Sequence, residues 1–254
     1  MACALSVRNL QKCYGSRGVV TRALDGVTSD VERGEYVAIM GASGSGKSTL
    51  LNCIATIDRP TAGQILLDGQ DVTELRQRDL ARFRRERLGF IFQDANLLDT
   101  LTGGENVALA LTINRTDPRT VDGRVRDACA RLGVTEVLDR YPRQMSGGQR
   151  QRVAAARALV TDPALVLADE PTGALDSRNA RLLLETFQRI NAEGATILMV
   201  THDSFAASYA GRVLFIKDGR VFNELRRGDR ARADFFHEVI DVVSFMGGEA
   251  ADVR

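Results

Sequence analysis

Tryptophan is absent from this chain of 254 residues, and histidine, cysteine and proline are scarce, with two, four and five residues respectively. The four cysteines are scattered, without a C-x-x-C spacing; they are Cys3, Cys13, Cys53 and Cys129. A zinc site or a redox pair would need closely spaced cysteines, and so few scattered thiols do not suggest a disulfide framework. We therefore expect four reduced cysteines, as in a cytosolic protein.

Long apolar runs are missing as well. No stretch approaches the roughly 18 residues that a membrane-spanning helix requires. Residues 1–7 lack the charged start and long apolar region of a signal peptide, so we expect none. The formal net charge of +1 gives no argument for nucleic acid or an acidic partner. With 44% hydrophobic and 26% charged residues, the composition is that of a globular protein with one large or two small domains.

A phosphate-binding loop is the clearest motif that is present. The pattern G-x-x-x-x-G-K-[ST] lies between an apolar run, 35–40, that predicts a strand and a run, 49–55, that predicts a helix. Glycines let backbone N–H groups converge on phosphate oxygens, which the helix N-terminus also attracts. Lys47 would reach the β- and γ-phosphates, and Ser48 would hold Mg²⁺. The motif consists of Gly41, Ala42, Ser43, Gly44, Ser45, Gly46, Lys47 and Ser48.

Two carboxylates follow a second apolar run. Residues 165–168 predict a strand, which ends in Asp169 and Glu170. Because ligands of open α/β sheets gather at the carboxyl ends of strands, these acids should face the phosphate site. We expect Asp169 to bind Mg²⁺ and Glu170 to act as general base on the attacking water. An acidic pair alone is usually a solvated loop, but the run P-T-G-A-L-D that follows, 171–176, disfavours that interpretation.

The remaining pattern alternates strands with helices. The stretch up to about residue 40 predicts antiparallel strands, and residues from about 93 to 159 are helical in pattern. This order predicts a parallel α/β sheet with a helical block inserted as a second lobe. Expected strands are 5–8, 26–31, 64–67, 195–200, 212–216 and 221–225, and expected helices are 119–132, 148–160 and 178–191.

Taken together, the motifs resemble those of ABC-type ATPases over about residues 3 to 225. The run S-G-G-Q resembles the signature motif of that family, and Met145 stands before it where leucine is usual, a volume-conserving change. Gln93 resembles the Q-loop glutamine and His202 the switch histidine. Asp176 lies in a D-loop-like run, and Tyr14 resembles the aromatic platform that stacks on adenine. The signature residues are Ser146, Gly147, Gly148 and Gln149.

The resemblance implies an α/β fold: a P-loop NTPase core with a parallel sheet, an N-terminal antiparallel β subdomain and an inserted α-helical subdomain at about 94–160. The implied cofactors are ATP and Mg²⁺. Catalysis would fall to Glu170, His202 and Gln93, and the metal to Ser48, Gln93 and Asp169. The nucleotide would contact Tyr14, the loop 41–48 with Thr49, the signature 146–149 and Asp176.

It also implies partners. Two copies would sandwich two ATP molecules head to tail as a homodimer, and the ATPase would work with integral membrane permease subunits at the inner face of the cell membrane. No nucleic acid is implied. The runs 50–63 and 92–98 resemble a subgroup that powers lipoprotein release, macrolide export and resistance to antimicrobial peptides. The alternatives are a non-transport ABC ATPase of DNA repair or translation, which usually carries a coiled-coil insertion or a second ATPase domain, and a P-loop kinase, which would not need S-G-G-Q.

Three further segments carry expectations. The arginine-rich run Arg76–Arg87 favours a solvated helix face over a nucleic-acid site, because Asp79 and Glu86 dilute it. Gly103 and Gly104 disfavour helix, so a helix there should start late. The extension 226–254 predicts an amphipathic helix over 234–246, capped by Asp234 and ended by Gly247, which packs on its own domain or mediates docking or dimerisation. It resembles the tail of bacitracin-type resistance ATPases; its stripe is Phe235, Val239, Val243 and Met246.

Overall fold

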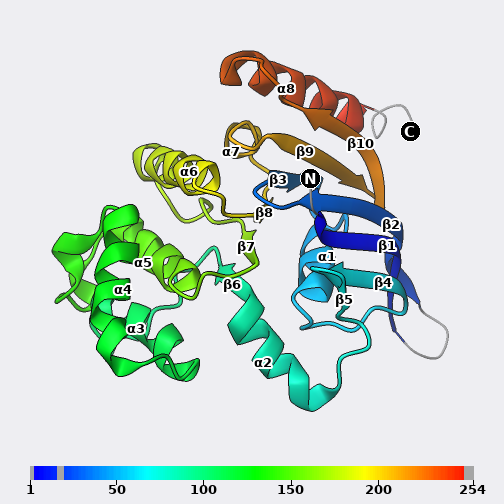
Figure 1. Cartoon of the computed structure of the whole chain (residues 1–254). Coiled ribbons are helices and arrows are strands. Elements are labelled where there is room, and N and C mark those ends of the chain that lie inside the picture. Colours follow the sequence, from blue (N-terminus) through cyan, green and yellow to red (C-terminus); the bar gives the residue numbers. More distant parts are fainter. Residues whose placement is uncertain (1–2, 16–19, 249–254) are drawn as a thin grey trace. The chain divides into compact units, whose positions relative to one another are not determined.

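The computed structural model describes residues 3–15 and 20–248 (Figure 1). The chain forms two compact units: the first combines residues 1–74 with 198–254, and the second is the continuous stretch 75–197. The helical segment predicted at about 94–160 lies inside the second unit. The last six residues of the C-terminal extension, 249–254, lie outside the described residues.

An antiparallel sheet opens the first unit. Its strands are β1 (Cys3–Tyr14), β2 (Thr21–Glu32), β4 (Ala62–Leu67) and β5 (Gln70–Asp71), in the order β2-β1-β4-β5. Leu5 of β1 stands opposite Val31 on one side and Leu67 on the other, and all three are buried. The predicted N-terminal antiparallel region is therefore confirmed, with β1 and β2 longer than the short runs that predicted them.

A second set of strands in the first unit carries the phosphate-loop motif. The strands β10 (Arg220–Arg226), β9 (Arg212–Lys217), β3 (Tyr36–Met40) and β8 (Ile197–Val200) are neighbours in that order, and the first residue of β8 is the last of the second unit. β3 runs parallel to β9, with Val37 opposite Arg212. All five residues of β3 are buried, as expected of a parallel strand covered on both faces. The helices of this unit are α1 (Lys47–Ile54), α7 (Ser204–Ala207) and α8 (Arg232–Gly248).

The second unit holds a parallel strand pair and most of the helices. β6 (Leu88–Ile91) runs parallel to β7 (Leu165–Asp169). β6 was not predicted, because it is short and contains Gly89; a Cβ at Gly89 would lie 2.4 Å from the Ala158 carbonyl oxygen, so the glycine allows helix and strand to approach closely. The helices are α2 (Gln77–Arg87), α3 (Gly103–Ile113), α4 (Pro118–Arg131), α5 (Gly147–Leu159) and α6 (Ser177–Ala192), with 3₁₀ turns at Thr135–Val137 and Pro142–Gln144.

Helix α2 has the solvated face that its arginines predict. Phe83 is its buried residue, and Arg78, Arg82 and Arg85 are exposed. Arg82 Nη2 lies 3.1 Å from Asp79 Oδ1, an i,i+3 pair of the kind that exposed helices carry. The face is therefore partly neutralised by its own acids.

The expectation of a late start for the helix at Gly103 was wrong. α3 begins at Gly103 itself, because Thr102 and Glu105 form a capping box that satisfies the first turn. The Gly103 and Gly104 N–H groups donate to the carbonyls of Arg140 and Leu138 at 2.8 Å. A Cβ at Gly103 would lie 2.6 Å from the Val137 carbonyl oxygen. The close approach of the Val137 carbonyl, which local propensity does not encode, requires a glycine at position 103.

The predicted tail helix exists, but its ends and its apolar stripe differ from expectation. α8 begins at Arg232, so Asp234 lies in its first turn and does not cap it, and it continues past Gly247 to Gly248. Phe235 and Val239 are fully buried, whereas Val243 is 38% exposed. The first half of the stripe therefore packs on this chain and the second half faces outward. Among the described helices, none combines the length and apolar composition needed to cross a membrane.

Candidate active site

The loop between β3 and α1 is shaped by glycine. Gly46, immediately before α1, has a φ of 106°, in the left-handed region that favours glycine. A Cβ at Gly46 would also lie 2.4 Å from the Ala23 carbonyl oxygen. The backbone can therefore turn tightly enough to open the N-terminus of α1 onto the loop, where its N–H groups and dipole favour an anion.

Lys47 and Ser45 give the loop its chemistry. The Lys47 ammonium is buried and donates to the carbonyls of Gly41 at 2.8 Å and Ala42 at 2.9 Å, so it lies across the loop. The Ser45 hydroxyl is buried and has no hydrogen-bond partner among the described residues. Buried polar groups normally have partners, so this hydroxyl fits a bound polar ligand. A cation and converging donors around one loop suit a polyphosphate.

Tyr14 belongs to a cluster that ties it to the helix after the loop. Its hydroxyl donates to Asp58 Oδ2 at 2.6 Å and shares a hydrogen bond with the Thr49 side chain. Lys12 Nζ lies 4.7 Å from the centre of the Tyr14 ring and 3.7 Å from Asp58 Oδ1, and donates to the Arg59 carbonyl at 2.8 Å. Burial, and then the Asp58 carboxylate, raise the pKa of the Tyr14 phenol. Asp58 therefore holds the hydroxyl at the edge of the Tyr14 ring and Lys12 covers one face, while Tyr14 remains 40% exposed.

His202 lies next to the strand that delivers the loop. The Thr201 N–H donates to the Ile39 carbonyl of β3 at 3.0 Å. On the other side of His202, Asp203 accepts a hydrogen bond from the Phe205 N–H at 2.9 Å and caps α7. The first unit thus brings together three predicted elements: the phosphate loop with Thr49, the tyrosine platform and the switch histidine.

The acidic pair lies in the second unit, at the end of β7. Asp169 is the last residue of that strand, and Glu170 has a φ of 46°, a left-handed conformation that is uncommon outside glycine. The Glu170 carbonyl accepts from the Gly173 N–H at 3.0 Å, which closes a turn. Non-glycine residues in such conformations cluster at functional sites. A Cβ at Gly173 would lie 3.1 Å from Gln93 Cδ, so the predicted Q-loop glutamine lies against this turn.

The predicted signature residues begin α5. Ser146 Oγ accepts from the Gln149 N–H at 3.2 Å, and Gln149 Oε1 accepts from the Ser146 N–H at 2.9 Å, a capping box. Gly148 packs against Asn179 of α6; a Cβ there would lie 2.0 Å from Asn179 Oδ1. Met145 is buried beside the motif, as a leucine substitute can be.

Asn179 also links the signature to the predicted D-loop. Its side-chain amide donates to Asp176 Oδ2 at 2.7 Å, and its backbone N–H donates to Asp176 Oδ1 at 2.8 Å. These bonds, the backbone one first, lower the pKa of the Asp176 carboxyl. The signature glycines and Asp176 are therefore parts of one packed assembly in the second unit.

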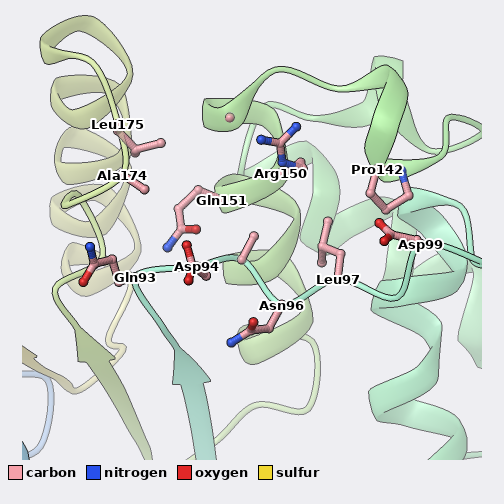
Figure 2. A pocket seen from close by; sticks show the side chains of 12 residues that line it. Gln93, Asp94, Asn96, Leu97, Asp99, Pro142, Arg150, Gln151, Ala174 and Leu175 are labelled. Atoms are coloured by element: carbon pink, nitrogen blue, oxygen red, sulfur yellow. The ribbon is translucent and has the colours of Figure 1, made fainter.

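A cleft of about 240 Å³ lies beside the Q-loop in the same unit (Figure 2). Two side chains of α5 hold the backbone of the loop that borders the cleft, and Gln151 is also one of the lining residues. Gln151 is buried and donates to the Phe92 carbonyl at 2.5 Å, and Arg157 donates to the carbonyls of Asn96 at 2.7 Å and Ala95 at 2.9 Å. Burial lowers the pKa of Arg157. The lining residues are Gln93, Asp94, Ala95, Asn96, Leu97, Asp99, Pro142, Gly147, Arg150, Gln151, Ala174 and Leu175.

Sequence reasoning missed Gln151 and Arg157. The sequence gives them little signal, because Arg150 and Arg152 of the same helix are polar too, although residues such as Val153 and Ala154 are small and buried. The two side chains fasten residues on both sides of Gln93 to the helix that begins at the signature: Gln151 holds Phe92, and Arg157 holds Ala95 and Asn96.

The predicted metal ligands are divided between the units, with Ser48 in the first and Gln93 and Asp169 in the second. Within the described ranges, no three His, Cys, Asp or Glu side chains gather closely enough to hold a metal by themselves. This set of oxygen donors contains one carboxylate, and it suits Mg²⁺, which usually takes one or two carboxylates and completes its shell with water and phosphate oxygens.

Comparison with known proteins identifies the family of this chain. The family model described as ABC transporter matches residues 24–173. The bacitracin export ATP-binding protein BceA of Halalkalibacterium halodurans is 46% identical, over 98% of each chain. The macrolide export ATP-binding/permease protein MacB of Hyphomonas neptunium is 45% identical over 87% of this chain and 34% of that longer protein.

Among solved structures, the dimeric post-hydrolysis state of the ATP-binding cassette MJ0796, bound to ADP and Pi, superposes with a TM-score of 0.79 at 36% identity, covering 87% of this chain and 98% of that one. The antiparallel sheet, the parallel strands and the helices match the fold that the motifs imply. With more than half of its length matched by the family model, the chain belongs to the ABC transporter family, as one of its ATP-hydrolysing cassettes.

Proposed function

We propose that this chain is the ATPase subunit of a membrane transporter that exports, or otherwise acts mechanically on, an antimicrobial peptide or a related antibiotic. The observation that carries this proposal is the 46% identity to BceA, a protein named for bacitracin export, along 98% of both chains. The shorter match to MacB, named for macrolide export, supports the same subgroup. These names favour a transporter over an ABC ATPase of DNA repair or translation.

The loop and its lysine bind the triphosphate, while the exposed face of Tyr14 stacks on the adenine. Glu170 accepts a proton from water as the water oxygen bonds to the γ-phosphorus and the bond to the ADP oxygen breaks. His202 holds the γ-phosphate and orients the water. A Mg²⁺ ion held by Ser48, Gln93 and Asp169 would neutralise charge on the phosphate oxygens.

The functional form in this proposal is a homodimer. The first turn of α5 offers the N–H groups of Gly147 and Gly148 at a helix N-terminus, where an anion is favoured. A γ-phosphate bound by the loop of a second copy supplies that anion, and Asp176 lies beside it. The dimeric state named for the MJ0796 cassette supports this arrangement.

The proposed membrane partner is a separate permease, with this subunit on the cytoplasmic face of the membrane. We assign its docking site to this cleft, because Gln93, the proposed metal ligand, lines it together with the residues that follow, up to Leu97. A partner seated there would sense the position of Gln93 through the same loop.

Substitution Glu170→Gln tests the chemistry. It removes the general base but no nucleotide contact, so steady-state ATP hydrolysis should fall by at least about 100-fold while ATP binding remains within about threefold. Glu185→Gln, an exposed change on α6, is the matched control and should leave both unchanged. Near-normal turnover in Glu170→Gln would remove the assigned role.

A further inference from the structure

The C-terminal helix is fastened to the short helix that follows the switch histidine (Figure 1). Arg232, the first residue of α8, places its guanidinium carbon 4.6 Å from the centre of the Tyr209 ring and 5.2 Å from that of Phe205. Its Nη1 donates to Ser208 Oγ at 3.2 Å. The Arg232 side chain therefore contacts Phe205 of α7 and the two residues that follow this helix, Ser208 and Tyr209.

Aromatic packing extends this contact. Phe236 of α8 meets Phe205 edge to face at 6.5 Å, and Phe205 meets Tyr209 in the same manner at 5.3 Å. Such geometries are favourable for aromatic pairs. Phe235 and Val239, on the same helix, are fully buried. The first turns of α8 are thus packed against the rest of the first unit through specific side-chain contacts.

Helix α7 is too short to be stable without contacts to other elements. It has four residues, which is far too short for independent stability, so its geometry depends on tertiary contacts. Only Asp203 separates His202 from α7, and Asp203 is the N-cap of that helix. On the inner side Ala206 and Ala207 are fully buried, and on the outer side lies Arg232. Since a single residue joins them, we expect a shift of α7 to be transmitted to His202.

We infer that Arg232 is a positioning residue for His202, through which the C-terminal helix sets the hydrolytic competence of the ATPase. The inference rests on the proposed role of His202. A planar guanidinium can lie on two rings and donate to Ser208 at once, and a lysine ammonium reproduces the charge without this geometry. The nucleotide-binding loop and Tyr14 are not in the cage that Arg232 forms with Phe205, Ser208 and Tyr209.

The test compares Arg232→Ala with Arg226→Ala in the full chain. Arg226 lies on β10, where its side chain pairs with Glu224, so its loss changes the charge equally without touching α7. For Arg232→Ala we expect kcat to fall about tenfold or more and KM for ATP to change less than about twofold, the pattern of lost transition-state stabilisation. Arg226→Ala should leave both constants unchanged.

A spectroscopic readout separates positioning from general destabilisation. The chain has two histidines, so histidine-labelled protein gives two imidazole signals, and His237→Gln identifies that of His202. In Arg232→Ala the His202 signal should shift or broaden in the ATP-bound state, and Arg232→Lys should restore part of kcat. If Arg232→Ala does not fold, Arg232→Gln, which keeps a donor for Ser208 but loses the cation, is measured in the same way.

An unchanged kcat together with an unchanged His202 signal would overturn the inference. So would a fall in stability with kcat preserved in the folded fraction. The variant His202→Ala distinguishes failure of the proposed role of His202 from failure of the inference about Arg232. If His202→Ala hydrolyses ATP normally, the proposed role of His202 fails. If it loses turnover while the Arg232 variants do not, only the role of Arg232 fails.

Discussion

Asp58 is the residue that connects the tyrosine platform to the loop-bearing helix. Its carboxylate accepts the Tyr14 hydroxyl at 2.6 Å, and its backbone N–H donates to the Asn52 carbonyl of α1 at 3.1 Å. The Tyr14 ring is therefore fixed relative to the phosphate loop before ATP arrives. Such preorganisation lowers the entropy cost of binding.

Asp58→Asn should weaken ATP binding by about 3- to 10-fold with little effect on saturated turnover, because a neutral amide holds the phenol and Lys12 less firmly. The comparison of Kd and kcat for ATP checks this, with Tyr14→Ala as the limiting case. Asp122→Asn, at a carboxylate with 80% exposure, is the control and should behave like the unchanged protein. A wild-type Kd in Asp58→Asn alongside a weakened Tyr14→Ala would show that the ring needs no anchor.

The buried thiols predict how stability depends on pH. Burial raises the pKa of Cys53 to about 11 and that of Cys129 to about 11, from an ordinary value of 9.0. The unfolded chain loses these protons first, so their stabilising contribution is complete below about pH 9 and is lost as pH rises toward 11. Melting temperatures across this range should fall less in Cys53→Ala/Cys129→Ala than in the unchanged protein. If the melting temperatures of the two proteins fall equally with pH, the thiols do not contribute to the pH dependence of stability.

At the scale of single elements, Ser146 has two separable tasks. It caps α5, and in the proposed dimer it faces a phosphate. Ser146→Ala should cost about 0.5–2 kcal/mol of unfolding free energy, because the first turn of α5 loses its cap. Ser146→Asp keeps a capping oxygen and should unfold nearly as the unchanged protein does. It should still lose turnover, since its carboxylate would repel the γ-phosphate. Urea unfolding and ATPase assays measure the two effects. Full activity in Ser146→Asp would exclude the phosphate contact.

Sequence-based prediction succeeded where an element is specified by its own residues. The G-K-S run after an apolar stretch predicts both the loop and α1, and the apolar run before Asp169 predicts β7. It failed where packing decides. Gly103 looks unfavourable for helix until Val137 is seen against it. The tail stripe reads as one surface, although Phe235 is buried and Val243 is exposed.

The same limit applies to the site. Motif residues such as Lys47 and Glu170 could be proposed for the site because their spacing and their neighbouring residues indicate a chemistry. Gln151, Arg157 and Arg232 could not, since each acts by reaching a backbone carbonyl or a ring that is distant in the sequence. No local pattern distinguishes such an arginine from the many exposed ones.

At the scale of the whole molecule, the proposed dimer gives a direct prediction. Glu170→Gln binds ATP without consuming it, so with ATP and Mg²⁺ it should elute from size-exclusion chromatography at twice the monomer mass of 27.7 kDa. With ADP it should elute as a monomer, because the γ-phosphate that contacts the second copy is absent. Combining Glu170→Gln with Ser146→Asp should abolish the dimer. A nucleotide-independent mass would contradict the sandwich arrangement.

The division of the first unit between two stretches of sequence has a consequence for biosynthesis. β3, the strand that leads into the loop, has β8 and β9 as its neighbours. Val37 of β3 is paired with Arg212 of β9. The ribosome must therefore add 212 − 37 = 175 residues after Val37 before its partner residue has been synthesised. At about 5–20 residues per second, β3 waits on the order of 9–35 s on the ribosome before its neighbour β9 is translated. The second unit, 75–197, is complete before then. A nascent chain can therefore complete the unit that holds Asp169 and Glu170 before β3, the strand that leads into the phosphate loop, has β9 beside it.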